Sequence, residues 1–180
     1  NVPGTNETGL WSLAATSPIA TINSASSPNT FISNLVSNNN YQLIWTLSNN
    51  ICPNTRDTVI IKNYLPLTNT IDTATITVCN GVTVNITGNL PIGGSAPYFY
   101  QWQIYNGSSW VDIPSATLIN YSFLATTTIK IRRLVNATPC SNVSLEKIIY
   151  VQPPLSNNTI NGNIQTCINT SPGVLTGSLP

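Results

Sequence analysis

The chain of 180 residues contains no histidine and no methionine, and it has few charged residues. Lys, Arg, Asp and Glu together make up 6% of the sequence, whereas ordinary soluble domains contain about 25%. The formal net charge is +1. Nucleic acids and anionic membranes are bound by surfaces of excess positive charge, so we expect neither as a partner.

The lack of histidine excludes several kinds of active site at once, because Ser-His-Asp triads, Cys-His pairs and many metal sites use imidazole. The acidic residues are spread singly along the chain, at Glu7, Asp57, Asp72, Asp112 and Glu146. Neither a CxxC motif nor an acidic calcium loop is present. The sequence therefore predicts no enzyme, no metal site and no cofactor. A carboxylate pair brought together by the fold is the remaining enzymatic alternative.

Long apolar runs are missing as well. No stretch approaches the ~18 apolar residues of a membrane span, so we expect no membrane insertion. A basic start followed by an apolar segment, which would indicate a signal peptide, is also lacking. The two ends, NVPGTNETGLW and TGSLP, are interpreted as cuts within a longer protein.

The polar residues that are abundant are uncharged: 25 Asn, 24 Thr and 18 Ser. Threonine and valine favour strands, whereas asparagine, glycine and proline favour turns. Alanine, lysine and glutamate, the usual residues of exposed helix faces, are scarce. The composition predicts an all-β protein.

The sequence repeats itself with a period of 88 to 89 residues. CNGVTVNITGNLP (79–91) returns as CINTSPGVLTGSLP (167–180). At a shift of 88 the matched residues are Cys52 with Cys140, Ile60-Ile61 with Ile148-Ile149, Pro66-Leu67 with Pro154-Leu155, Ile76 with Ile164, and Cys79 with Cys167. After one inserted residue, Thr87-Gly88 matches Thr176-Gly177. Such a period indicates tandem modules.

The repeat predicts three segments. Residues 1–65 form a module that lacks its first strands, and residues 66–153 form a complete module. Residues 154–180 contain a linker and the first strands of a third module. The proline-containing stretches YLPLTNT (64–70) and VQPPLSNNT (151–159) are interpreted as semi-rigid spacers between modules.

Seven strand-sized runs separated by turn residues are found in the complete module, at 74–79, 82–87, 98–105, 109–113, 120–124, 128–135 and 144–151. This spacing is typical of an immunoglobulin-like (Ig-like) antiparallel β-sandwich. Alternation places Trp102 on a core-facing side together with Tyr100 and Ile104. The predicted fold is a series of tandem Ig-like β-sandwich modules of about 88 residues.

The four cysteines are spaced so that two pairing rules are compatible with a repeating array. In the favoured one, Cys79 bonds Cys140, and Cys52 and Cys167 have partners outside the sequence. In the other, Cys52 bonds Cys79 and Cys140 bonds Cys167. Sequence alone does not fix the connectivity. Either rule implies an oxidising, extracytoplasmic setting.

Aromatic residues are dense between 98 and 110, and exposed aromatic rings can bind sugars. Tyr105 and Trp110 are the candidate ligand contacts, provided that they form a coplanar exposed pair. Arg132 and Arg133 are adjacent, so alternation sends their side chains to opposite faces. We interpret them as part of a solvated strand.

The residues at 100–117 (YQWQIYNGSSWVDIPSAT), 120–124 (NYSFL) and 126–142 (TTTIKIRRLVNATPCSN) resemble Ig-like repeats of giant cell-surface proteins of Bacteroidota. The residues at 9–35 and 41–61 resemble PKD-like repeats of the same proteins, which include gliding-motility adhesins exported by the type IX secretion system. The resemblance implies a non-enzymatic adhesin or filament exposed on the outer membrane. It also implies O-glycosylation at Asp-Thr followed by a small or apolar residue, which nominates Thr58 and Thr73.

The resulting functional hypothesis is a structural and adhesive stalk segment of a large, repetitive extracellular surface protein. Its expected partners are neighbouring modules of the same chain, together with lateral copies of itself. The alternative is an array of carbohydrate-binding modules that contacts a surface polysaccharide through exposed aromatics. A decoration protein of a virus particle is also compatible with the sequence.

Overall fold

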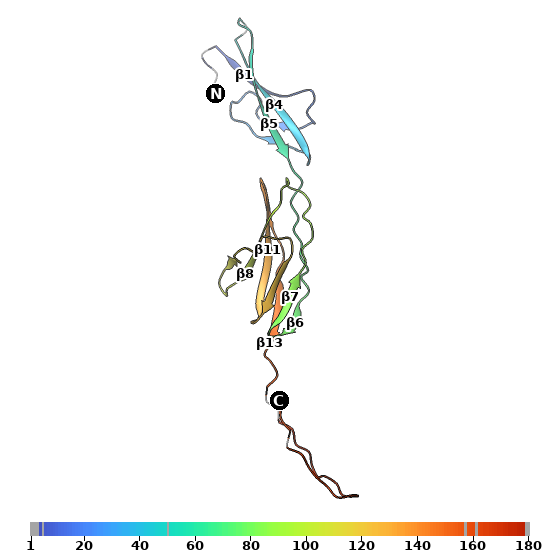
Figure 1. Cartoon of the computed structure of the whole chain (residues 1–180). Helices are drawn as coiled ribbons and strands as arrows, with labels where there is room; N and C mark the ends of the chain where they lie inside the picture. The colour runs from blue at the N-terminus through green and yellow to red at the C-terminus, as the bar shows by residue number, and fades with distance from the viewer. Residues whose placement is uncertain (1–3, 5, 50, 157, 161, 179–180) are drawn as a thin grey trace. The chain divides into compact units, whose positions relative to one another are not determined.

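A computed structural model of the chain describes residues 4, 6–49, 51–156, 158–160 and 162–178 (Figure 1). Every regular element in the described residues is a β-strand. The strands are β1 (Thr8–Leu13), β2 (Thr21–Ile22), β3 (Ile32–Ser33), β4 (Asn39–Ser48), β5 (Thr55–Asn63), β6 (Ile76–Cys79), β7 (Val82–Ile86), β8 (Phe99–Tyr105), β9 (Trp110–Asp112), β10 (Tyr121–Ala125), β11 (Ile129–Ala137), β12 (Cys140–Val143) and β13 (Lys147–Gln152). Within this part of the chain, no helix is long and apolar enough to cross a membrane.

The contacts divide the chain into two compact units. The first unit comprises Asn1–Asn69, Pro91–Phe99 and Val135–Asn142. The second comprises Thr70–Leu90, Tyr100–Leu134 and Val143–Pro180.

The first unit contains an antiparallel sheet with the strand order β1-β4-β5 and a short ribbon of β2 and β3. β4 is the central strand, and its alternation explains its place: Tyr41, Leu43 and Trp45 are buried on one face. Trp45 lies opposite Trp11 of β1 and opposite Asp57 of β5. The inner face of the sheet therefore carries aromatic and aliphatic residues of β1 and β4 beside the polar Asp57 of β5.

The core of the second unit lies between two layers of strands. One sheet has the order β6-β13-β11-β8-β9, with β12 also paired to β11, and the other consists of β7 and β10. The buried core residues are Ile71, Val84, Ile86, Trp102, Ala116, Ala125, Ile131 and Ile149. Val84 and Ile86 come from the smaller sheet, and Trp102, Ile131 and Ile149 from the larger one. Two sheets that enclose one core make a β-sandwich.

The structure confirms the predicted all-β, Ig-like β-sandwich fold. The seven predicted strands correspond to β6, β7, β8, β9, β10, β11 and β13. β12 was not predicted, because it is short, contains Ser141 and Asn142, and directly follows Pro139. Those residues are typical of turns.

The sequence repeat is matched by a repeat of strand register. In the first unit, Tyr41 pairs with Ile61, and Leu43 pairs with Val59. In the second unit, Ile129 pairs with Ile149, and Ile131 pairs with Lys147. Each residue of the second set lies 88 positions after its counterpart in the first. β4 and β5 are therefore the structural equivalents of β11 and β13.

Candidate functional site

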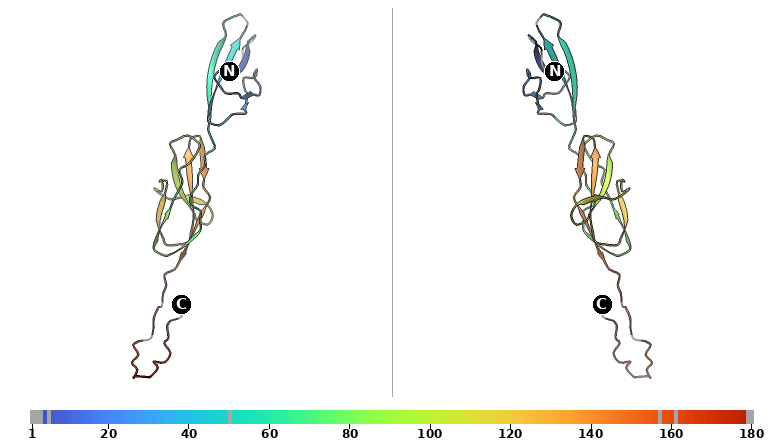
Figure 2. Two further views of the ribbon diagram at one scale, coloured as in Figure 1. Left: turned by 90° about the vertical axis from the view of Figure 1, so that its right-hand side faces the viewer. Right: turned by 90° about the vertical axis from the view of Figure 1, so that its left-hand side faces the viewer.

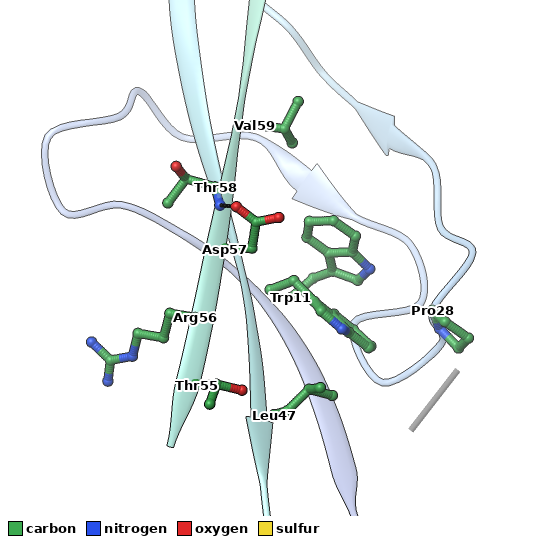
Figure 3. Close-up of a pocket in the computed structure, with 9 residues that line it drawn as sticks. Trp11, Pro28, Leu47, Thr55, Arg56, Asp57, Thr58 and Val59 are labelled. Carbon is green, nitrogen blue, oxygen red and sulfur yellow. Dashed lines mark hydrogen bonds between the residues drawn. The ribbon is translucent and has the colours of Figure 1, made fainter. Parts of the chain in front are cut away.

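A cleft of about 440 Å³ lies on the inner face of the β1-β4-β5 sheet of the first unit (Figure 3). Its lining residues are Trp11, Pro28, Trp45, Leu47, Thr55, Arg56, Asp57, Thr58 and Val59. Figure 3 shows the side chains of Thr55, Asp57 and Val59 on the side of β5 that faces Trp11, and those of Arg56 and Thr58 on the opposite side. This arrangement is the period-2 alternation of a strand. We call this feature the Trp45 cleft.

Two indole rings form the floor of the Trp45 cleft. The centroids of Trp11 and Trp45 are 5.0 Å apart, and their planes meet at 43°. The indole nitrogen of Trp11 donates to the carbonyl oxygen of Ser27 at 3.1 Å. The indole nitrogen of Trp45 is buried and has no hydrogen-bond partner in the described residues. A buried donor without an acceptor costs about 1–3 kcal/mol, so this nitrogen marks an incomplete site.

The position of the Trp45 ring depends on Gly9 of β1. A Cβ atom added at Gly9 would lie 2.1 Å from a ring carbon of Trp45. No real Cβ atom makes so close a contact, and the neighbouring ring is held between strands. Gly9 therefore provides the space into which the Trp45 ring packs.

The second unit has Arg133 at the position equivalent to Trp45, and this arginine is fully buried. Its Nη1 donates to the carbonyl oxygen of Ile119 at 2.7 Å. Its Nη2 donates to the carbonyl oxygens of Asn89 at 2.8 Å and of Thr70 at 3.1 Å. The guanidinium carbon also lies 5.0 Å from the ring centroid of Tyr100. Carbonyl dipoles and a ring face compensate the buried charge.

This burial corrects one sequence-based interpretation, in which Arg132 and Arg133 belonged to a solvated strand. The two side chains do point to opposite faces, but Arg133 shares its face with the buried residues Ile131 and Val135. Removal from water lowers the pKa of the Arg133 guanidinium. The planar fork of an arginine can bind several carbonyls at once, which is why this residue type is suited to the position.

Gly88 permits the approach of Arg133. A Cβ atom at Gly88 would lie 1.9 Å from Nη1 of Arg133 and 2.5 Å from the backbone oxygen of Ile119. We expect Gly88→Ala to lower the free energy of unfolding by about 1–3 kcal/mol, because the guanidinium and its acceptor cannot both be kept. Urea denaturation measures this change. Gly177→Ala is the matched control, since its nearest atom would be at 3.8 Å; equal losses in both variants would contradict the role of Gly88.

Lys147 is a second buried cation of the same unit, with a relative exposure of 1%. Its Nζ donates to a carboxylate oxygen of Asp72 at 3.0 Å and to the carbonyl oxygen of Ala74. The pKa of the Asp72 carboxyl is held below its ordinary value of 3.8, mainly by a hydrogen bond from the backbone N–H of Ala74 and also by Lys147. The segment 70–89 thus supplies acceptors to both buried cations.

The lowered pKa of Asp72 predicts a dependence of stability on pH. A carboxyl group whose pKa is lower in the folded state stabilises the fold above its unfolded pKa, and this contribution is lost as the pH falls through the folded value. We expect the loss below the ordinary value of 3.8. It should stay under about 1 kcal/mol, because the carboxylate is half-exposed and screened by water. Denaturation measured from pH 2 to pH 6 gives this loss of stability. Its pH dependence should follow the titration of about one group. Asp72→Asn should flatten that part of the profile, and an unchanged profile would contradict the assignment.

The two candidate ligand-contact aromatics lie together on the second unit, with ring centroids 5.5 Å apart. Their planes meet at 52°, so they do not form the coplanar pair that the sequence-based hypothesis required. The guanidinium carbon of Arg132 lies 4.3 Å from the centroid of Trp110. Arg132 also donates to Gln103 at 2.8 Å, and Gln103 donates to Asp112 at 2.8 Å. Tyr105 is exposed and Trp110 half-buried. These five residues form one polar and aromatic surface cluster.

The cysteines do not pair in the structure. Cys52, Cys79, Cys140 and Cys167 are all free thiols, and Cys140 is half-buried whereas the other three are exposed. Cys79 is the last residue of β6, and Cys140 is the first residue of β12. The two pairing rules, Cys79 with Cys140 or Cys52 with Cys79 and Cys140 with Cys167, stay predictions.

The nominated glycosylation sites are both exposed. Thr73 precedes β6, and its neighbour Asp72 is the residue that binds Lys147. Thr58 lies within β5, and its backbone N–H donates to its neighbour Asp57 at 2.8 Å. Glycosylation at these residues stays a prediction.

The described residues contain no group of three or more His, Cys, Asp or Glu side chains that could hold a metal ion. The strongly held side chains, Arg133 and Lys147, are buried among backbone carbonyls, where they stabilise the fold. The Trp45 cleft combines an apolar floor, an unpaired donor and an adjoining strand edge.

Comparisons with known proteins find likeness at the level of structure. No family profile matches the chain, and no curated protein matches it. Among 16 solved chains that match, the N-terminal four Ig domains of Dscam1 isoform 6.9 are 12% identical over 81% of this chain and 38% of that one, with a TM-score of 0.42. Isoform 4.44 is 14% identical over 82% and 37%, with a TM-score of 0.41. The tandem Ig repeats of Dlar are 10% identical over 82% and 84%, with a TM-score of 0.37. The chain spans about two fifths of the length of the Dscam1 structures, and the likeness extends to the fold alone.

Proposed function

We propose that the chain is a non-enzymatic structural and adhesive segment of a large, repetitive surface protein. Its Ig-like modules, with boundaries at 1–65, 66–153 and 154–180, act in series as a stalk. The observation that carries the proposal is the repeated register, in which Tyr41–Ile61 of one sheet corresponds to Ile129–Ile149 of the next. A repeat in both sequence and strand pairing is what a tandem array of like units produces.

The character of the surface supports the same proposal. Only 6% of the residues are charged, so long-range repulsion between copies is weak and lateral self-association is favoured. The Asp-Thr motifs at Thr58 and Thr73 are exposed, as O-glycosylation outside the cell would require, and the proposed location is the cell surface. The gliding-motility adhesins of Bacteroidota are the proposed relatives, with the type IX system as the export route.

A stalk and a binding module respond differently to the deletion of one period and to the loss of an aromatic side chain in the parent protein. Deletion of one period, residues 66–153, shortens a stalk by one unit without removing a binding face. We expect adhesion of the source cells to fall in a graded manner with the number of periods removed.

Antibodies against residues 66–153 should label intact cells as strongly as permeabilised ones; labelling only after permeabilisation would refute the surface location.

Contact with a surface polysaccharide is the second candidate function. The observation that favours it is the cluster of Tyr105, Trp110, Arg132, Gln103 and Asp112, which combines aromatic and polar groups on one exposed surface. If the cluster binds sugar, Trp110→Ala abolishes adhesion while the number of periods has little effect. If the chain is a stalk, Trp110→Ala leaves adhesion unchanged.

A further inference from the structure

Arg132 is the cation of the second unit whose charge is not compensated within the described residues. Lys130 and Lys147 form ion pairs with carboxylates, and Arg133 is bound by backbone carbonyls. Arg132 forms no ion pair with any described residue. An uncompensated charge at a surface attracts an anion from outside the chain, because no carboxylate of the chain already occupies it.

Two contacts hold the side chain of Arg132 in place. Its guanidinium carbon lies 4.3 Å from the ring centroid of Trp110, and its Nε donates to Oε1 of Gln103 at 2.8 Å. The ring covers one face of the guanidinium, and the hydrogen bond uses one of its N–H groups. The N–H groups of Nη1 and Nη2 have no acceptor among the described residues. They are therefore available to a ligand.

Asp112 fixes the orientation of Gln103 toward Arg132. The Nε2 of Gln103 donates to Oδ1 of Asp112 at 2.8 Å. An ionised carboxylate only accepts hydrogen bonds, so the amide nitrogen faces Asp112 and the amide oxygen faces Arg132. The three side chains come from adjacent strands of the larger sheet, in the order β11-β8-β9 (β8 is yellow-green and β11 orange in Figure 2). The guanidinium is thus preorganised, which lowers the entropy cost of binding.

This arrangement is not required by the strand that carries Arg132. The residue 88 positions earlier, on the equivalent strand β4 of the first unit, is Ile44. A strand of the same register is therefore built without an arginine at this position. The held guanidinium is a property of the second unit alone, as expected for a binding group and not for a structural one.

The shape of the free groups indicates the chemistry of the ligand. The paired N–H groups of a guanidinium match two oxygens of one carboxylate or sulfate group. Because Arg132 covers one face of Trp110, that face is not a platform for a sugar ring. The ring of Tyr105 is exposed, and its centroid lies 5.5 Å from that of Trp110. An apolar ring beside one free cation suits a ligand that combines C–H groups with a single negative charge.

We infer that Arg132 binds the carboxylate or sulfate groups of an acidic polysaccharide. Its Nη1 and Nη2 donate to the two oxygens of one anionic group, and the Tyr105 ring contacts the adjoining sugar. Trp110, Gln103 and Asp112 are positioning residues that hold the guanidinium. The inference rests on the second candidate function, contact with a surface polysaccharide, and specifies its ligand.

The first test compares charged and neutral forms of the same polymers. Binding of the 180-residue protein is measured by calorimetry with polygalacturonate and with its methyl ester, and with dextran sulfate and dextran. We expect at least one charged form to bind about tenfold or more tightly than its neutral counterpart. Tight binding of polygalacturonate alone assigns the carboxylate as the ligand group, and tight binding of dextran sulfate alone assigns the sulfate.

The second test locates the contact on the second unit. Arg132→Met should weaken binding of the charged polymer by about tenfold or more. Arg132→Lys keeps the charge but loses the planar fork, and should weaken binding by about threefold or more. Arg56→Met is the matched control, since Arg56 is an exposed arginine that makes no ring contact in the described residues. It should change the affinity by less than about twofold.

The outcomes separate a failure of the inference from a failure of the second candidate function. Equal binding of charged and neutral polymers would overturn the role of Arg132 but keep contact with a polysaccharide. No binding of any of these polymers would overturn both. Equal losses in Arg132→Met and Arg56→Met would show an unspecific effect of charge and would overturn the inference. Polyglutamate bound as tightly as polygalacturonate would assign the site to acidic proteins instead.

Discussion

Replacing Arg133 with methionine is expected to lower the free energy of unfolding of the second unit by about 3–5 kcal/mol. Methionine fills much of the space, but it removes the arginine donors from the carbonyl oxygens of Asn89 and Ile119 and leaves that of Thr70 with the backbone N–H of Asn89 alone. Replacement of a buried charge by an apolar residue can be neutral when its partners are removed as well. Here the partners are backbone groups, which no side-chain substitution removes.

Urea denaturation, with hydrogen exchange of peptides from β11 to assign the transition to the second unit, measures the effect. Arg132→Met is the matched control, since Arg132 is the same residue type on the exposed face of the same strand and contacts Trp110 and Gln103 at the surface. It should cost less than about 1 kcal/mol. If the two variants are equally stable, the guanidinium of Arg133 does not hold the three segments together.

Trp102→Ala is the second substitution with a large expected effect, also a loss of about 3–5 kcal/mol. The Trp102 ring is fully buried in the core and lies 5.8 Å from the ring of Tyr121 in a stacked arrangement. Its indole nitrogen donates to the carbonyl oxygen of Leu118 at 2.9 Å. The substitution therefore leaves a cavity and removes the donor of a partly buried carbonyl.

The comparison variant is Trp110→Ala, in which the same ring is removed from the surface cluster. We expect it to cost about 1 kcal/mol or less, because water replaces the lost contacts. Calorimetry compares the two melting temperatures. Similar shifts for Trp102→Ala and Trp110→Ala would show that the core position of Trp102 is not what stabilises the sandwich.

Alternation of residues along strands made much of this fold predictable. It placed Trp102 inward, and the structure confirms that position. Alternation also places Arg133 on the same face as Ile131 and Val135, whereas the charge of the arginine predicts that its side chain lies in solvent. Alternation gives the correct answer, because a strand residue cannot change its face without a shift of the strand register.

The partners that make this burial possible could not be predicted from the sequence. The acceptors of Arg133 at Thr70 and Asn89 lie 63 and 44 residues away along the chain. Backbone carbonyls carry no sequence signal, since every residue has one. Lys147 is hidden for the same reason, because one of its two acceptors is the carbonyl of Ala74.

The candidate site was missed for a different reason. In the sequence, the aromatic residues that could contact a sugar are Tyr105 and Trp110, whose rings are not coplanar. The Trp45 cleft is instead recognised by two groups without a partner among the described residues, the indole nitrogen of Trp45 and the outer edge of β5. The sequence repeat does indicate that Trp45 occupies a special position, since Trp45 is aligned with Arg133 of the next module.

The parallel pairing of β6 with β13 has a mechanical consequence. Ile76, where the chain begins β6, lies level with Ile149, and Gln152, where the chain leaves β13, lies level with Cys79. Tension applied to the two ends of the module therefore pulls these strands in opposite directions along their length. The interstrand hydrogen bonds are then loaded together in shear and must break at nearly the same moment. They cannot break one after another, as they would if the strands were peeled apart from one end.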